Sequence, residues 1–311
     1  MMRSFVPLVS FTILCAALRP AAAAEVTAEK THEGVAIKVD GQPFAEYLVK
    51  SGSKPVLWPI IGPTGKRMTR NWPLETGVAG ETDRDHPHQR SLWFSHGDVG
   101  GVDFWSEGQG RIEHREFVKI ASGQPSEIVT RNDWLSPDGS KLICQDERTF
   151  TFGARADSRF VDVAIDIKAT AGPVVFGDTK EGSFGVRVAS SMRVAAKKGG
   201  KIVNSEGQTD DAAWGKPAAW VDYHGPVDGE TLGIAILNHP TSFRFPTHWH
   251  VRTYGLFAAN PFGLAAFTGG KSKGEYTLAE GETLKLRYRV LLHKGDEKEG
   301  RVAEAFAEFA K

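Results

Sequence analysis

Short segments in which hydrophobic and polar residues alternate run through most of the chain. Residues 35–39 and 44–49 are two of them, separated by Asp40-Gly41, and an Asp-Gly pair supplies the positive φ angles that a tight hairpin turn needs. Residues 160–167 alternate without interruption, as do the apolar positions of 284–292. Residues two apart on a strand share a face, so both segments predict long strands with one buried side.

The same pattern, punctuated by glycine and proline, predicts further strands. They fall at 115–120, 127–134, 141–152, 183–194, 218–223, 231–237, 254–258 and 264–268, with Pro137-Asp-Gly139 closing one hairpin. Only residues 296–311 place apolar side chains at helical spacing, which predicts a short amphipathic helix. No internal repeat of roughly 20 to 50 residues is visible. The pattern therefore predicts an all-β fold, a large antiparallel β-sandwich with a short C-terminal helix.

The first 24 residues differ in composition from the rest. Met1 to Arg3 form a short basic start, residues 5–18 a mostly apolar run, and Ala21 to Ala24 a small-residue cleavage site, the order typical of a secretory signal peptide. The apolar run is shorter than the ~20 residues that a membrane span needs. We therefore expect a periplasmic or secreted protein without a membrane span. Residues 25–311 are expected to form a single domain, because β-sandwiches can exceed about 200 residues.

The composition limits the classes of molecule that the protein is expected to bind. The chain of 311 residues is 41% hydrophobic and 24% charged, as in ordinary globular proteins. Its 38 Lys and Arg residues balance 38 Asp and Glu residues, so it lacks the basic excess of a nucleic-acid-binding protein. Loss of the leader would leave Cys144 as the one cysteine, in an apolar stretch where we expect a buried thiol and no disulfide.

Histidine, arginine and aromatic residues gather in two segments, 83–105 and 246–263, with a glycine-rich segment, 176–187, between them. His86 with His88, and His248 with His250, have the His-x-His spacing that metal sites often use. Each pair has arginines nearby that would repel a cation, so we predict neither a metal nor another cofactor. A metal-dependent hydrolase or oxygenase, built on His86, His88 and His96 or on His248 and His250, stays as an alternative.

Glu181 stands between Lys180 and a glycine, and a carboxylate beside a cation can serve as a general base. Eight tryptophans offer flat surfaces for sugar rings. Signatures of serine hydrolases, nucleoside triphosphatases, dinucleotide-binding enzymes and H-E-x-x-H metalloproteases do not occur in the sequence.

Several motifs resemble a known family. They are Asp85-His-Pro-His88-Gln-Arg90-Ser-Leu-Trp93-Phe, Asp103-Phe-Trp105, Gly177-Asp-Thr-Lys-Glu-Gly182, His248-Trp-His250-Val-Arg-Thr-Tyr-Gly255 and Asn260-Pro-Phe-Gly263. In this order they resemble the bacterial family often labelled methane oxygenase PmoA-like, over nearly the whole mature chain. This chain has Gln89 and Ser91 where many members carry a histidine and a glycine. A weaker similarity joins the pattern to galactose mutarotase-like supersandwich proteins, a fold that hosts sugar epimerases and polysaccharide lyases.

The leading hypothesis is a carbohydrate-active enzyme that performs acid/base chemistry on a sugar or oligosaccharide, of the epimerase or lyase type. Its candidate catalytic residues are His88, His250 and Glu181. The candidate substrate-binding residues are Arg70, His86, Arg90, Trp105, Asp178, Lys180, Arg187 and Arg252, with Trp105 stacking on the sugar. A non-catalytic carbohydrate-binding protein that uses the same surface is the second alternative.

Overall fold

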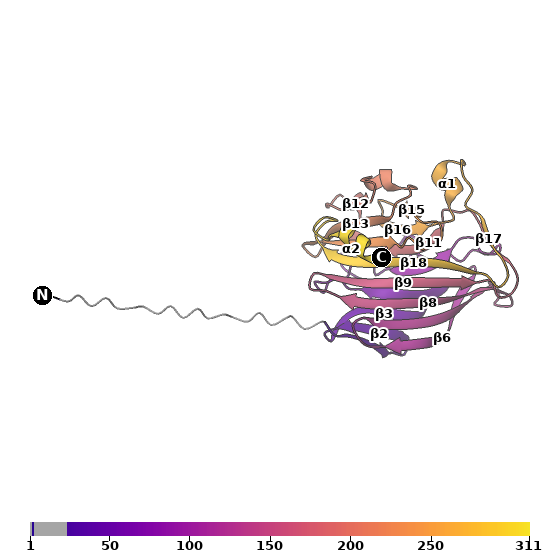
Figure 1. Cartoon of the computed structure of the whole chain (residues 1–311), viewed down its shortest axis with the longest axis horizontal. Coiled ribbons are helices and arrows are strands. Elements are labelled where there is room, and N and C mark those ends of the chain that lie inside the picture. The colour runs from indigo at the N-terminus through magenta and orange to yellow at the C-terminus, as the bar shows by residue number, and fades with distance from the viewer. Residues whose placement is uncertain (1, 3–23) are drawn as a thin grey trace.

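A computed structural model describes Met2 and residues 24–311, so the predicted signal peptide lies almost wholly outside the described residues. Within that part, the strands form two eight-stranded antiparallel sheets that face each other, as Figure 1 shows, and a separate two-stranded ribbon. The predicted all-β sandwich is thereby confirmed. None of the helices among the described residues has both the length and the apolar character to cross a membrane.

The first sheet carries the candidate site. In spatial order its strands are β1 (Val26–Lys30), β2 (Gly34–Val39), β3 (Gln42–Ser51), β4 (Lys54–Ile60), β5 (Leu92–His96), β11 (Gly182–Arg187), β16 (Leu256–Asn260) and β15 (His248–Val251). The predicted hairpin at Asp40-Gly41 joins β2 to β3, and both turn residues have positive φ, +50° and +74°. This is the backbone conformation that an Asp-Gly pair favours.

The second sheet contains most of the long strands. In spatial order they are β12 (Lys201–Asn204), β13 (Trp220–Val227), β14 (Glu230–Asn238), β18 (Thr283–Lys294), β9 (Ser158–Lys168), β8 (Leu142–Ala154), β7 (Ser126–Leu135) and β6 (Arg111–Ala121). The two-stranded ribbon pairs β10 (Val174–Phe176) with β17 (Tyr276–Leu278). Three short 3-10 helices complete the connections: η1 (Ser190–Met192), η2 (Val194–Ala196) and η3 (Asp210–Ala213).

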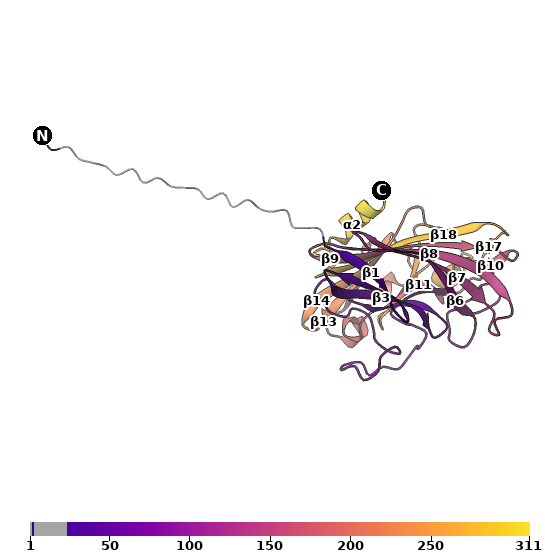
Figure 2. The same cartoon turned by 90° about the horizontal axis from the view of Figure 1, so that it is seen from below.

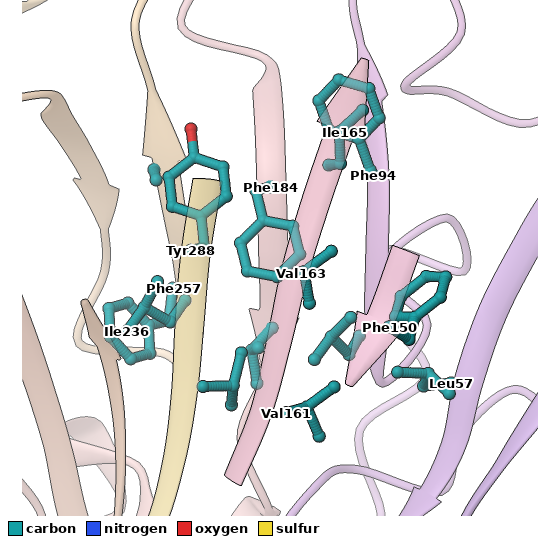
Figure 3. Close-up of a cluster of buried hydrophobic side chains, with 14 of the residues drawn as sticks. Leu57, Phe94, Phe150, Val161, Val163, Ile165, Phe184, Ile236, Phe257 and Tyr288 are labelled. Carbon is teal, nitrogen blue, oxygen red and sulfur yellow. The ribbon is translucent and has the colours of Figure 1, made fainter. Parts of the chain in front are cut away.

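The core fills the space between the sheets. Figure 3 shows side chains from both layers meeting there, among them Phe94, Phe184 and Phe257 from the first sheet. Phe184 lies parallel to Tyr288 of the second sheet, with ring centroids 4.7 Å apart. β9 and β18 of the second sheet form the opposite side of the core, because every second residue of each strand is buried there.

One strand prediction is wrong in part and another is wrong altogether. The strand predicted over 183–194 ends at Arg187 and gives way to η1 and η2. Residues 264–268 form the helix α1 (Leu264–Thr268), which ends where Gly269 takes a left-handed conformation. A run of five residues is too short for periodicity to separate a helix from a strand.

The C-terminal helix exists but is shorter than predicted. α2 spans Val302–Phe309, and residues 295–301 form a loop before it. α2 packs on the outer face of the second sheet, where Val302 contacts a small apolar cluster with Ala235, Leu237 and Leu291. In Figure 2 α2 lies at the top of the sandwich, and the long purple connection between β4 and β5 hangs from the opposite side. That connection covers the outer face of the first sheet.

Candidate active site

Four strands of the first sheet present their outward side chains in one row. The register aligns Trp93 of β5 with Gly185 of β11, Ala258 of β16 and His250 of β15. Glycine is needed at 185, since a Cβ there would lie 2.8 Å from the Trp93 ring. The opposite faces of these strands fill the core. The row therefore lies on the outer face of the first sheet, where its side chains are buried, with His250 at one end.

Two buried arginines hold the 83–91 loop onto this surface. Arg70 is 1% exposed and Arg187 is fully buried. Asp85 accepts hydrogen bonds from Arg70 Nη1 at 2.6 Å and from Arg187 Nη2 at 3.2 Å. Gln89 accepts from Arg187 through its side chain and from Arg70 through its backbone carbonyl. Asp85 and Gln89 thus fix the loop by satisfying two cations that would otherwise be buried without partners.

The pKa values in this cluster follow from burial and charge. Burial lowers the pKa of Arg70 to about 10, and the neighbouring Arg187 adds to the effect. Burial alone would raise the pKa of Asp85, but Arg187, His86 and Arg70 outweigh it and hold that pKa well below its usual range. Asp85 is therefore ionised at any pH at which the protein is expected to work.

The loop brings two histidines to the surface. His86 stacks on Tyr254 with its ring centroid 5.1 Å away, and its Nδ1 lies 2.6 Å from Asp85 Oδ2. The half-buried His88 ring lies 5.7 Å from His86 and 6.1 Å from Trp105. Burial lowers the pKa of His88 to about 4, helped by the charge of Lys54. His88 is consequently a neutral imidazole near pH 7.

His250 is held in a single tautomer. Its Nδ1 lies 2.7 Å from the carbonyl oxygen of Lys180, which can only accept, so Nδ1 carries the proton and Nε2 has a free lone pair. The side chain is 3% exposed, and burial lowers its pKa to about 4. The Nε2 of His250 is therefore unprotonated near pH 7.

Glu181 connects the two histidines electrostatically. Its negative charge raises the pKa of His88 and that of His250, against the larger effect of burial on each. Glu181 directly follows Lys180, whose carbonyl binds His250, and its charge also reaches His88 from a segment over 150 residues away in the chain. Lys180 pairs with Glu181 at the exposed side of the group.

Lys54 is a functional candidate that sequence reasoning missed. Its ammonium group is fully buried, donates to the Trp105 carbonyl at 3.1 Å and lies 3.8 Å from Glu107. Burial lowers its pKa to about 8, although Glu107 opposes the shift. In the sequence, Lys54 stands directly before the apolar segment 55–60. An ordinary surface lysine can occupy such a position, so the pattern did not mark Lys54 as functional.

Arg252 differs from the other arginines of the group. Its guanidinium lies 5.9 Å from the Trp214 ring and 5.8 Å from the Tyr254 ring. Within the part of the chain that the structure describes, it has no carboxylate within ion-pair distance and no side-chain hydrogen bond. Its positive charge lowers the pKa of His250. Arg252 is thus a half-buried cation beside His250 with a free charge.

The structure brings most of the candidate residues together. His88, His250 and Glu181 form the group described above, and the contacts of that group extend to His86, Lys180, Arg70, Arg187 and Arg252. His248 contacts Phe267 on the same side of β15 as His250, as a strand requires.

Three candidates for substrate binding have other roles. Trp105 is 1% exposed, and its ring centroid lies 5.2 Å from that of Trp93. Its ring is therefore buried beside His88 and is not accessible for stacking on a sugar. Asp178 accepts backbone N–H groups from Ala265 and Gly274, which fixes the loop around α1. Arg90 is occupied by Glu107 and by the hydroxyl group of Ser51.

One of the alternative metal sites does not assemble. His96 is fully buried, with Nε2 2.8 Å from the Gly177 carbonyl and Nδ1 3.2 Å from the Ser183 hydroxyl. It packs against Phe262 on the core side, whereas His86 and His88 lie on the outer loop. The three histidines therefore cannot share an ion in this arrangement.

Comparison with known proteins gives a family and no activity. A family model described as a family of unknown function, DUF6807, matches residues 34–307. The chain belongs to the DUF6807 family. The PmoA-like label is not confirmed by this match. No curated protein matches the DUF6807 chain in sequence.

Two solved structures resemble the DUF6807 chain at the level of fold. One is a crystal structure of a β-arabinopyranosidase, at 12% identity and a TM-score of 0.32, covering 89% of this chain and 39% of that one. The other is a variant of a glycoside hydrolase family 97 enzyme from Pseudoalteromonas sp. strain K8, at 11% identity and a TM-score of 0.35, covering 88% and 34%. The DUF6807 chain thus spans little more than a third of either protein.

Proposed function

We propose that the protein is an exported carbohydrate-active enzyme that performs acid/base chemistry on a sugar bound at the outer face of the first sheet. The observation that carries this proposal is the placement of Glu181 near both His88 and His250, next to the unpaired Arg252. Two neutral imidazoles, a carboxylate and a free cation on one surface are the groups that proton transfer at a polar substrate needs.

The tautomer of His250 is the one that a base needs. Its free Nε2 takes a proton from the substrate, and the nearby carboxylate of Glu181 stabilises the imidazolium that forms. A pKa of about 4 makes His250 a weak base, so the proton removed must already be acidic, such as one on a carbon next to a carbonyl or carboxyl group. Keto-sugars and uronic acids have such protons.

The remaining groups complete the reaction. When the C–H bond breaks, its electron pair moves to the carbonyl or carboxyl oxygen, where Arg252 offers a positive charge and His88 a neutral N–H donor. Epimerisation follows when water donates a proton to the opposite face of that carbon and the resulting hydroxide takes the proton held by His250. Elimination follows when the substituent on the next carbon leaves with its bonding electron pair and the proton held by His250. Trp214 and Tyr254 flank Arg252 and replace Trp105 as the proposed stacking surface.

A binding protein without catalysis is the second candidate, favoured by the aromatic rings around Arg252 and by two histidine pKa values that lie far below 7. Such a protein would need Arg252, Trp214 and Tyr254 but not the free Nε2 of His250. The two candidates therefore differ in what His250→Gln should do.

The test follows hydrogen exchange by NMR in D₂O with a panel of uronic acids, keto-sugars and their neutral parent sugars. The wild-type protein should introduce deuterium next to the carbonyl or carboxyl group, or release an unsaturated product, for at least one acidic or keto compound. His250→Gln should slow that reaction by on the order of 10²-fold or more. The matched control is His32→Ala, because His32 is an exposed histidine at the β1–β2 turn. Binding of a panel compound without any exchange would contradict the enzyme and support the binding protein.

A further inference from the structure

A second cluster of titratable side chains lies on the outer face of the other sheet. Asp222 and His224 project to the same side of β13, and His293 projects beside them from β18. Glu297 reaches the group from the 295–301 loop that precedes α2. The acid/base group of the first sheet uses none of these residues.

The cluster is buried and contains two carboxylates. The side-chain exposures are 0% for Asp222, 8% for His224 and 15% for Glu297. In the described residues, histidines alone lie within ion-pair distance of the two carboxylates. Both nitrogens of His293 face acceptors, Asp222 Oδ2 and the Lys294 carbonyl, so His293 compensates the charge of Asp222. Glu297 has only His224 within ion-pair distance among the described residues, so a cation held between Glu297 and His224 would compensate its charge.

The ligand atoms stand at nearly the spacing of a metal site. His224 Nδ1 lies 2.6 Å from an oxygen of Asp222 and 3.8 Å from an oxygen of Glu297, and all three atoms lie within 4.8 Å of one another. Ligands about 2.1 Å from a tetrahedral zinc ion are about 3.4 Å apart. To reach that spacing, the His224–Asp222 pair must open by about 0.8 Å and the His224–Glu297 pair must close by about 0.4 Å.

The outer contacts of the cluster match those of metal sites. The second oxygen of Asp222 lies 2.7 Å from His293 Nε2, and His293 Nδ1 lies 3.0 Å from the Lys294 carbonyl. Groups that orient a ligating carboxylate in this way are typical of the surroundings of metals in proteins. Gly233 and Gly300 leave room for the His293 ring, since a Cβ at either position would lie 2.1 Å from it.

We propose that Asp222, His224 and Glu297 bind one divalent transition-metal ion that ties the 295–301 loop to β13. One imidazole nitrogen and two carboxylate oxygens suit Zn²⁺ better than Ca²⁺ or Mg²⁺, which prefer oxygen ligands throughout. The metal takes the place of the proton that His224 otherwise shares with Asp222, and water completes its coordination. This site is separate from the proposed sugar site and does not depend on it.

The test uses untagged protein, stripped with a chelator and then titrated with Zn²⁺ alone. We expect one zinc per chain after dialysis, a thermal midpoint raised by several degrees, and a visible absorption spectrum of tetrahedral type when Co²⁺ replaces zinc. Glu297→Gln, a change at a loop residue that should fold, is expected to weaken zinc binding at least tenfold. His224→Ala should abolish the cobalt spectrum.

Two controls separate this site from the histidines of the first sheet. His32→Ala and His248→Ala should both bind zinc as the wild type does. Failure of the wild-type protein to hold zinc at micromolar concentration would overturn the proposal. So would zinc binding that survives Glu297→Gln and His224→Ala but is lost in His248→Ala, since that result would place the ion at β15.

Discussion

Replacing Asp85 by asparagine tests whether the 83–91 loop depends on its bonds to two buried arginines. Asparagine keeps the size of the side chain and one acceptor oxygen but removes the negative charge. The amide oxygen can still accept from Arg70, whereas the amide NH₂ would face Arg187, which also donates. The variant therefore leaves one fully buried guanidinium with Gln89 as its main partner.

The cost follows from the burial of each partner. Breaking a fully buried ion pair costs about 3 to 5 kcal/mol because one charge is left uncompensated. Here both arginines are buried, but the Asp85 carboxylate is 41% exposed, and water screens part of the interaction. Both arginines also keep hydrogen bonds to the loop backbone or to Gln89. We therefore expect Asp85→Asn to lower the free energy of unfolding by about 2 to 3 kcal/mol at pH 7.

Urea denaturation at pH 7 and at pH 3 measures this difference. The folded pKa of Asp85 lies below its unfolded value, so its contribution is present above about pH 4 and is lost as the pH falls through the folded pKa. The difference in free energy of unfolding between wild type and Asp85→Asn should therefore be smaller at pH 3 than at pH 7. Asp157→Asn is the control, because that carboxylate is 79% exposed and pairs with a surface lysine. If the free energies of unfolding of wild type and Asp85→Asn differed at pH 7 by under about 0.5 kcal/mol, and by no more than those of wild type and the control, the reasoning would be refuted.

Four further predictions concern the core, the site and the leader. Phe184→Ala should lower the free energy of unfolding by about 3 to 5 kcal/mol in urea denaturation, because the ring is 1% exposed and packs on Tyr288. Lys54 has a folded pKa of about 8, below its unfolded value, so wild-type stability should rise relative to Lys54→Met between about pH 8 and 10 when both are denatured in urea. His88→Ala should reduce turnover on the order of 10²-fold while costing no more than about 2 kcal/mol in a thermal melt, and full activity in a badly destabilised variant would show a structural histidine. Mass spectrometry of exported protein should find residues 1–24 removed, and an intact Met1 would contradict this.

Strands with one face in the core and one at the surface were predictable. β9, and β18 up to Val290, alternate because their outward residues are partly exposed and their inward residues meet the first sheet. β5 shows no such alternation, since all five of its residues are buried between the core and the 83–91 loop. Its sequence, Leu92-Trp-Phe-Ser-His96, therefore gives no periodic signal for a strand.

The residue types at the site were predictable, but their partners were not. His250 and Glu181 stood out because histidine and charge gather near glycine and tryptophan in the sequence. The pairing of Asp85 with Arg187 joins residues 102 positions apart, and only the register of β5 on β11 brings them together. The burial of Lys54 and of Trp105 likewise depends on how the loops fold over the sheet, which local patterns do not encode.

The contact between Trp93 and Trp105 gives this surface its own optical reporter. The two indole rings are 5.2 Å apart, and Trp105 also adjoins the His88 ring. Indoles this close couple their electronic transitions, and a nearby imidazole quenches indole emission more strongly once it is protonated. A compound that displaces His88 or changes its protonation should therefore alter the emission and near-ultraviolet circular dichroism of the pair. Libraries of sugars can be screened against the unlabelled protein in this way before any product is known, with Trp105→Phe identifying the part of the signal that arises here.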